Sequence, residues 1–214
     1  MLKLPERLGQ KLLAAGYRVT KEPLSEDAGL ELIRHADNAY LYRENGTVPR
    51  IYVVPTVRLA STDEEALSLI GSGLFDPLQV AVVTTDEPSP SIEPVAENLA
   101  TTLSASADYL HYGSDRLTAR VAANAAAMVV FSEMYYPGWR ATVDGMPVTV
   151  WNVNYAFRGI VIHEGIHTIE MTFRSQAYEE GMQVSLVTAA LIFISNVVIY
   201  LLTFNKPGQR RITS

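Results

Sequence analysis

The sequence contains no cysteine among its 214 residues. Disulfide bonds and thiolate metal sites are therefore excluded. The absence does not fix the compartment, because a cysteine-free chain is as compatible with an oxidising exterior as with a reducing cytoplasm.

The sequence also contains no basic run before its C-terminus. It carries 17 Lys and Arg against 23 Asp and Glu, a net charge of -6. This balance argues against a nucleic-acid-binding protein, which normally presents a basic face.

One long segment lacks charge altogether. Residues 184–204 read VSLVTAALIFISNVVIYLLTF, 21 residues that are mostly apolar. At a rise of about 1.5 Å per residue, such a helix spans the roughly 30 Å hydrocarbon core of a bilayer. The sequence therefore predicts one transmembrane helix over residues 182–205, with the lipid bilayer as a partner. The rejected alternative is a buried core helix, which would be shorter and would show a polar stripe.

The charges that flank this segment predict its orientation. Lys206, Arg210 and Arg211 follow it, whereas Glu179 and Glu180 precede it. Because basic residues favour the cytoplasmic side, residues 206–214 are expected to form a cytoplasmic tail and the preceding body to be extracytoplasmic. The N-terminus has no apolar stretch of signal-peptide length. We therefore expect the chain to be the C-terminal piece of a longer, polytopic membrane protein.

The first 84 residues predict a small mixed α/β module. A helix is expected over residues 5–16, and short strands over 17–21, 30–34, 39–42, 51–54 and 79–83. Ser61 and Glu64 have the spacing of a capping box, which predicts a helix that ends near Gly71 or Gly73. Residues 85–107, rich in Pro, Ser, Thr and Ala, are expected to be a linker or long loop.

Residues 108–181 predict an antiparallel β-sandwich, which makes the fold class α+β. The strongest signal is Asp144-Gly145, a two-residue turn between strands at 139–143 and 146–150. This register places Val143 opposite Met146, Ala141 opposite Val148 and Trp139 opposite Val150. These six residues share one face, as a half-buried sheet requires.

His163-Glu164-Gly165-Ile166-His167 matches the H-E-x-x-H pattern of zinc proteases. That chemistry needs both histidines on one face of a helix. Here the motif lies in GIVIHEGIHTIEMTF, a β-branched segment that favours a hairpin with Glu164-Gly165 at its turn. In that register His163 and His167 point to opposite sheet faces, so the metalloprotease interpretation is rejected. No other catalytic, cofactor-binding or metal-binding set is predicted.

Tyr135, Tyr136 and Trp139 form an aromatic cluster within YYPGW. Aromatic rings of this kind bind sugars or other ligands in some proteins, but more often they fill a core or brace a membrane-proximal surface. These three residues are the candidates for ligand or glycan contact.

The run from residue 132 to 173 resembles the C-terminal region of YfhO-type bacterial membrane proteins. The resemblance is carried in order by YYPGW, the Asp144-Gly145 turn, Arg158-Gly159 and the segment from Gly165 to His167. VPRIYVV at residues 48–54, the DEEAL helix and Phe75-Asp76-Pro77 also fit. It covers about residues 17–204.

The resemblance implies an integral protein of the bacterial cytoplasmic membrane, similar to glycosyltransferases that use lipid-linked sugars to modify cell-envelope polymers. The many N-terminal spans of that family are absent here, so no residue of this chain receives a catalytic role. The alternative is a stand-alone, membrane-anchored β-sandwich that binds envelope glycan or a protein partner.

Overall fold

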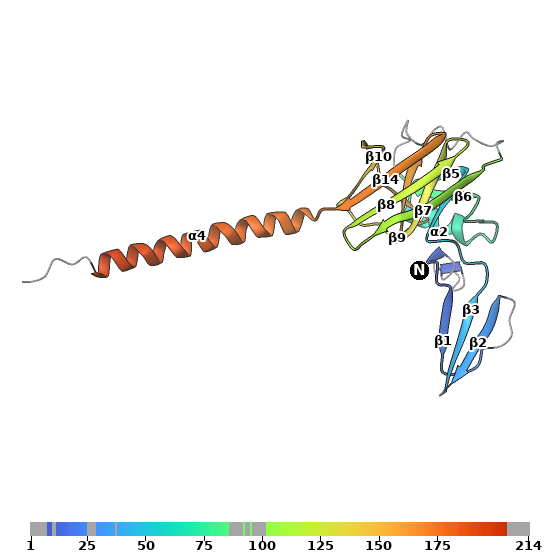
Figure 1. The fold of residues 1–214 in the computed structure, drawn as a ribbon, viewed down its shortest axis with the longest axis horizontal. Coiled ribbons are helices and arrows are strands. Elements are labelled where there is room, and N and C mark those ends of the chain that lie inside the picture. The colour runs from blue at the N-terminus through green and yellow to red at the C-terminus, as the bar shows by residue number, and fades with distance from the viewer. Residues whose placement is uncertain are drawn as a thin grey trace, which may run out of the picture. The chain divides into compact units, whose positions relative to one another are not determined.

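The computed structural model describes residues 8–9, 12–24, 29–36, 38–85, 92, 95 and 102–204. The chain divides into two compact units, Met1–Arg174 and Ser175–Ser214. The first unit is built mainly of strands in three sheets, and the second holds one long helix (Figure 1). The expected α+β class is therefore confirmed. Of the helix expected over residues 5–16, positions 5–7, 10 and 11 lie outside the described residues, as does the tail at 206–214.

The smallest sheet is an antiparallel set of three strands near the N-terminus, in the order β1-β3-β2. Its strands are β1 (Tyr17–Thr20), β2 (Leu30–Ala36) and β3 (Ala39–Glu44). Arg18 and the largely buried carboxylate of Glu44 form an ion pair of 3.3 Å between β1 and β3. All three strands were predicted from the sequence.

The largest sheet has six strands in the order β4-β9-β13-β12-β6-β5. They are β4 (Ile51–Val54), β5 (Thr56–Ala60), β6 (Val80–Thr84), β9 (Ala127–Met134), β12 (Trp151–Val153) and β13 (Phe157–Ile162). Only β5 and β6 are parallel, and α2 (Asp63–Gly71) connects them. Thr62, one residue after the expected Ser61, caps this helix: its hydroxyl accepts from the Glu65 N–H at 3.2 Å, and Glu65 accepts from the Ser61 N–H at 2.8 Å.

The third sheet has five antiparallel strands in the order β11-β10-β14-β8-β7. They are β7 (Ala105–Tyr112), β8 (Arg116–Ala123), β10 (Trp139–Val143), β11 (Met146–Val148) and β14 (Gly165–Phe173). The β10–β11 hairpin has the predicted register, and both turn residues have positive φ (51° at Asp144 and 80° at Gly145). The pairing ends at Val148, so the expected extension to Val150 is wrong.

The six-stranded sheet is apolar on both faces, because each face covers a separate core. One core lies against the five-stranded sheet and contains Phe131, Ile160, Ile169 and Met171. The other lies on the opposite face, where Val130 and Val82 pack with Ile70 of α2. This double burial explains why six consecutive residues of β9 are buried instead of alternating. The two larger sheets thus form the predicted sandwich (Figure 1).

Two expectations differ from the structure. The hairpin expected around Glu164-Gly165 is wrong, because β13 pairs with β9 and β12 in one sheet and β14 pairs with β8 and β10 in the other. The boundary expected at residue 84 also differs, since β4 pairs with β9 and β6 pairs with β12 inside the sandwich. Within the expected linker at 85–107, β7 already begins at Ala105.

Gly159 of β13 occupies a position with no room for a side chain. A Cβ atom built there would lie 2.4 Å from Val153 Cγ1 and 2.8 Å from Met128 Sδ. We expect Gly159→Ala to lower the free energy of unfolding by about 1–3 kcal/mol through overpacking. Denaturant titration would measure the loss, and Val153→Ala in the same chain should recover part of it. Stability equal to wild type in the single variant would contradict this packing.

The described part of the second unit contains α4 (Gln176–Phe204), which begins before the expected position 182. Its segment Ala177–Thr203 is long and apolar enough to cross a membrane. Two of its polar side chains bond to the helix's own carbonyls one turn back: Thr188 to Val184 at 2.9 Å, and Asn196 to Ile192 at 2.8 Å. These bonds reduce the cost of placing the polar groups in hydrocarbon.

Candidate functional site

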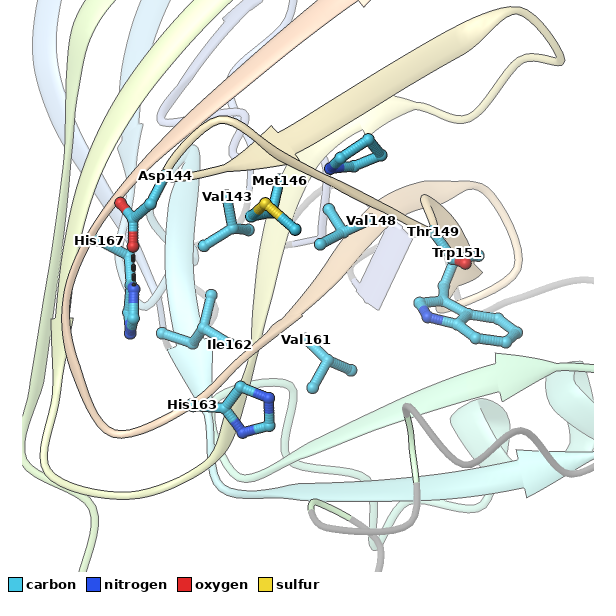
Figure 2. A pocket seen from close by; sticks show the side chains of 11 residues that line it. Val143, Asp144, Met146, Val148, Thr149, Trp151, Val161, Ile162, His163 and His167 are labelled. Atoms are coloured by element: carbon cyan, nitrogen blue, oxygen red, sulfur yellow. Dashed lines mark hydrogen bonds and ion pairs between the residues drawn. The ribbon is translucent and has the colours of Figure 1, made fainter.

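A pocket of about 640 Å³ opens beside the β10–β11 hairpin (Figure 2). Its lining is mostly apolar, with polar groups from three side chains at one end. The apolar lining residues are Val143, Met146, Pro147, Val148, Trp151, Val161 and Ile162. The polar end is formed by Asp144, His163 and His167, and Thr149 lies near Trp151. Apolar lining with a few polar groups is the usual composition of a ligand site.

The strand pairing explains why the pocket is there. The short strand β12 pairs only with Phe157–Gly159 of β13, so the last three residues of β13 continue past its end. The neighbouring β11 is the edge strand of the other sheet, and Pro147 at its centre carries no N–H for further pairing. Two short strands therefore leave the sandwich open on this side, over Val161 and Ile162.

Asp144 and His167 form a fixed pair at the polar end. His167 Nδ1 lies 2.7 Å from Asp144 Oδ2, and because an ionised carboxylate only accepts, Nδ1 carries the donated proton. The other carboxylate oxygen accepts from the Thr168 N–H at 2.8 Å, while the Asp144 N–H donates to the Thr168 carbonyl at 2.9 Å. The pair therefore fastens the hairpin turn to β14.

The free nitrogen of His167 does not face a substrate position. Its Nε2 is buried without a hydrogen-bond partner, and a Cβ built on Gly165 would lie only 3.2 Å away. A histidine that acts as a general base needs that nitrogen within reach of a bound proton donor. The geometry of the Asp144–His167 pair therefore supports a structural role, which is to hold the hairpin turn against β14.

The H-E-x-x-H motif is not on a helix: His163 and Glu164 lie in the connection after β13, and Gly165, Ile166 and His167 begin β14. The expectation that His163 and His167 point to opposite faces of one sheet is wrong, because both line the same pocket (Figure 2). Among the residues that the structure describes, no group of three or more His, Asp or Glu is placed to hold a metal ion. Tetrahedral zinc sites in proteases take three protein ligands.

The Asp144 contacts predict a dependence of stability on pH. The Thr168 N–H, followed by His167, holds the pKa of the Asp144 carboxyl below its ordinary value of 3.8. Since the folded pKa is depressed, the stabilisation is complete above the unfolded pKa of about 3.9 and is lost as the pH falls through the folded value. We expect the melting temperature of Asp144→Asn to lie below that of the wild type at pH 7 and the gap to close below about pH 4. A gap that stays constant down to pH 3 would contradict this role.

The three aromatic candidates lie at the other end of β10. Trp139 packs against Phe173 with ring centroids 5.5 Å apart, and Tyr136 packs on the same ring at 5.9 Å. The Arg158 guanidinium carbon stands 3.9 Å from the centroid of Trp139, so one face of the indole is covered. Tyr136 is 63% exposed, whereas Tyr135 is half-buried. Of the three, Tyr136 is the ring that solvent reaches most freely.

Arg158 is the residue that sequence reasoning missed. It is 5% exposed, and its Nη2 lies 3.8 Å from Glu133 Oε2. Burial lowers the pKa of its guanidinium, which the Glu133 carboxylate partly offsets. Glu133 also accepts from the Tyr112 hydroxyl at 2.7 Å and from Arg50 Nη1 at 3.3 Å. The sequence contained a signal for this burial, because Arg158, Ile160 and Ile162 are spaced two residues apart and therefore share the inward face of β13.

Residues 93–185 match the family model described as "Bacterial membrane protein YfhO". This part of the chain is a YfhO-type region. It contains β7 to β14, the pocket, the aromatic cluster and the first turns of α4. Searches of curated proteins and of solved structures find no match. The YfhO match and the apolar helix α4 together indicate a region associated with a membrane.

Proposed function

We propose that this YfhO-type chain is the extracytoplasmic C-terminal region of a polytopic membrane protein. In this proposal, the whole protein transfers sugar from a lipid-linked donor to a cell-envelope polymer. The match over residues 93–185 is the observation that carries the proposal. The catalytic groups are assigned to parts of the protein outside this chain, and the sandwich supports or covers the membrane active site or holds the acceptor.

The pocket beside the β10–β11 hairpin is the part of the sandwich best suited to the acceptor. Trp151 at one end offers a ring, and Asp144 and His163 at the other offer polar groups. Sugars bind through hydroxyl groups and through apolar ring faces, so they match such a mixed lining. The same pocket favours the second candidate, a membrane-anchored module that binds glycan or a protein partner without catalysis.

The orientation can be tested through the absence of native cysteine. Ser106→Cys introduces one thiol at an exposed position of β7. We expect a membrane-impermeant maleimide to label this variant in intact cells, and the cysteine-free chain to remain unlabelled. Labelling that appears only after the cells are broken would overturn the extracytoplasmic placement.

The sugar-transfer role can be tested with two variants of similar exposure. Met146→Glu places a charge at the pocket, where Met146 is 70% exposed, and Ile166→Glu is the control, at a residue of β14 that is 65% exposed and outside this pocket. In cells, deletion of the protein should remove a sugar from an envelope polymer. Met146→Glu should reduce its incorporation several-fold, and Ile166→Glu should not.

The results separate the two candidates. An unchanged glycan composition after deletion would overturn the transferase role. If the purified wild-type protein then binds envelope glycan or a protein and Met146→Glu does not, the anchored binding module is the better description.

A further inference from the structure

The connection from the end of β9 to the start of β10 carries exposed apolar side chains next to an aromatic cluster. Met134 is 61% exposed and Tyr136 is 63% exposed. Tyr136 and Trp139 both pack on Phe173, the last residue of β14. We call Met134, Tyr136, Trp139 and Phe173 the aromatic end. Met134 and Tyr136 are therefore large apolar side chains that the fold leaves largely exposed to solvent.

Two arginines flank the aromatic end. Arg140 is exposed and lies directly opposite Thr172 of β14. Arg174 is exposed as well, and its N–H donates to the Gly138 carbonyl at 2.9 Å. Gly138 has φ of 115°, and a Cβ built there would lie 2.6 Å from the Arg174 carbonyl oxygen, so this junction requires glycine. Neither arginine forms an ion pair with any residue that the structure describes; the nearby Arg116 is 4.0 Å from Glu170.

The chain keeps the aromatic end close to the apolar helix. β14 ends at Phe173 and α4 begins at Gln176, so Arg174 and Ser175 alone separate them. At no more than about 3.6 Å of extended chain per residue, the three steps from Phe173 to Gln176 cover at most roughly 11 Å. The eight further residues to the uncharged stretch at Val184 add about 12 Å at 1.5 Å per residue. This covalent limit holds for any arrangement of the two units.

We propose that the aromatic end is a bilayer contact, in which Met134 and Tyr136 enter the interfacial region and Arg140 and Arg174 bind lipid phosphates. Tyrosine and tryptophan are enriched where hydrocarbon meets water, and basic side chains beside apolar ones bind anionic headgroups. A globular unit held there by its own sheet would be fixed in orientation over the membrane. The proposal rests on the membrane helix and is independent of any sugar chemistry.

The test uses single cysteines in the otherwise cysteine-free full chain. Tyr136→Cys reports on the aromatic end, and Met134→Cys is a second reporter in case the first variant does not fold. Ile166→Cys is the matched control, because it is 65% exposed and lies seven residues from Phe173 on the same strand, about 23 Å away at 3.3 Å per residue. Each variant is labelled with a fluorophore and reconstituted in vesicles of phosphatidylcholine and phosphatidylglycerol.

Lipids that carry a nitroxide in the headgroup then measure contact with the interface. We expect them to quench the label at position 136 or 134 at least threefold more than the label at 166. A water-soluble quencher should show the reverse order. Equal quenching by the nitroxide lipids at the two ends of the sheet would overturn the proposal. So would labels at positions 136 and 134 that the water-soluble quencher reaches as readily as the label at 166. This second result is the one expected of an open sugar-binding platform.

The arginines give an independent readout. Arg140→Gln together with Arg174→Gln should lower the lipid quenching at position 136 by twofold or more in vesicles with phosphatidylglycerol, and by less in vesicles of phosphatidylcholine alone. No change in either vesicle would remove the phosphate contacts from the proposal. Because the reporters measure depth and not transfer, their result does not depend on whether the sugar-transfer role survives its own test.

Discussion

Phe131→Ala is expected to lower the free energy of unfolding by about 3–5 kcal/mol, because it removes a large side chain from the centre of the core. Phe131 is 0% exposed and lies in β9, which is paired with β4 on one side and β13 on the other. Its ring faces the core between the two large sheets, 6.2 Å from the ring of Tyr109 on β7. Truncation would therefore leave a cavity shared by both sheets.

Denaturant titration of the detergent-solubilised chain would measure this loss, with the slope against denaturant showing whether unfolding stays two-state. Phe131→Leu is the matched variant, because it keeps much of the apolar volume and should lose clearly less. Ile166→Ala, at an exposed position of β14, should change stability by under about 0.5 kcal/mol. A loss below about 1 kcal/mol for Phe131→Ala would mean that the two sheets do not share a packed core.

Trp139→Ala is expected to cost about 3 kcal/mol, near the lower end of the range for a buried tryptophan, because the indole is only partly buried. The change removes the contact with Phe173 and exposes one face of the Arg158 guanidinium, which is otherwise stacked on the ring at 3.9 Å. A buried cation that loses such a neighbour is destabilised beyond the loss of apolar area.

Thermal unfolding would measure the effect, and Trp139→Phe, which keeps an aromatic face toward Arg158, should retain most of the stability. An unchanged melting temperature of Trp139→Ala, accompanied by lost glycan binding, would show that Trp139 is a sugar platform. Contact of Tyr135, Tyr136 and Trp139 with glycan remains a prediction until that binding is measured.

The features that the sequence predicted are those fixed by neighbouring residues. The β10–β11 hairpin depends on Asp144-Gly145 at the turn and on alternation within ten residues, and its register was found as expected. The helix α2 depends on an N-terminal cap and an acidic first turn, which are also local signals. The apolar helix depends only on length and composition.

Features that depend on distant residues were missed. Ile162 and Ile169 face the same core, but from opposite sheets. The alternation of apolar and polar residues is identical for two strands of one hairpin and for two strands that face each other across a sandwich, so the pattern could not distinguish these arrangements. The pocket was missed for the same reason, since it lies where the short strands β11 and β12, which belong to different sheets, leave the sandwich open. Nothing local indicates that β4 pairs with β9, or that β5 and β6 belong to the same sheet of the sandwich.

The order of strands in the five-stranded sheet has a consequence for how the protein is made. The last strand in the sequence, β14, lies between β8 and β10 in the middle of that sheet. In the other large sheet, β4 cannot pair until β9 has been synthesised. The five-stranded sheet cannot form completely on a growing chain until about residue 173 has been synthesised, and the six-stranded sheet cannot form completely until β13 ends at Ile162. Folding dominated by such distant pairings is slow and leaves edges open to aggregation in the meantime. The sandwich therefore reaches its native state only when synthesis has arrived at the membrane helix, so folding and anchoring are nearly simultaneous events.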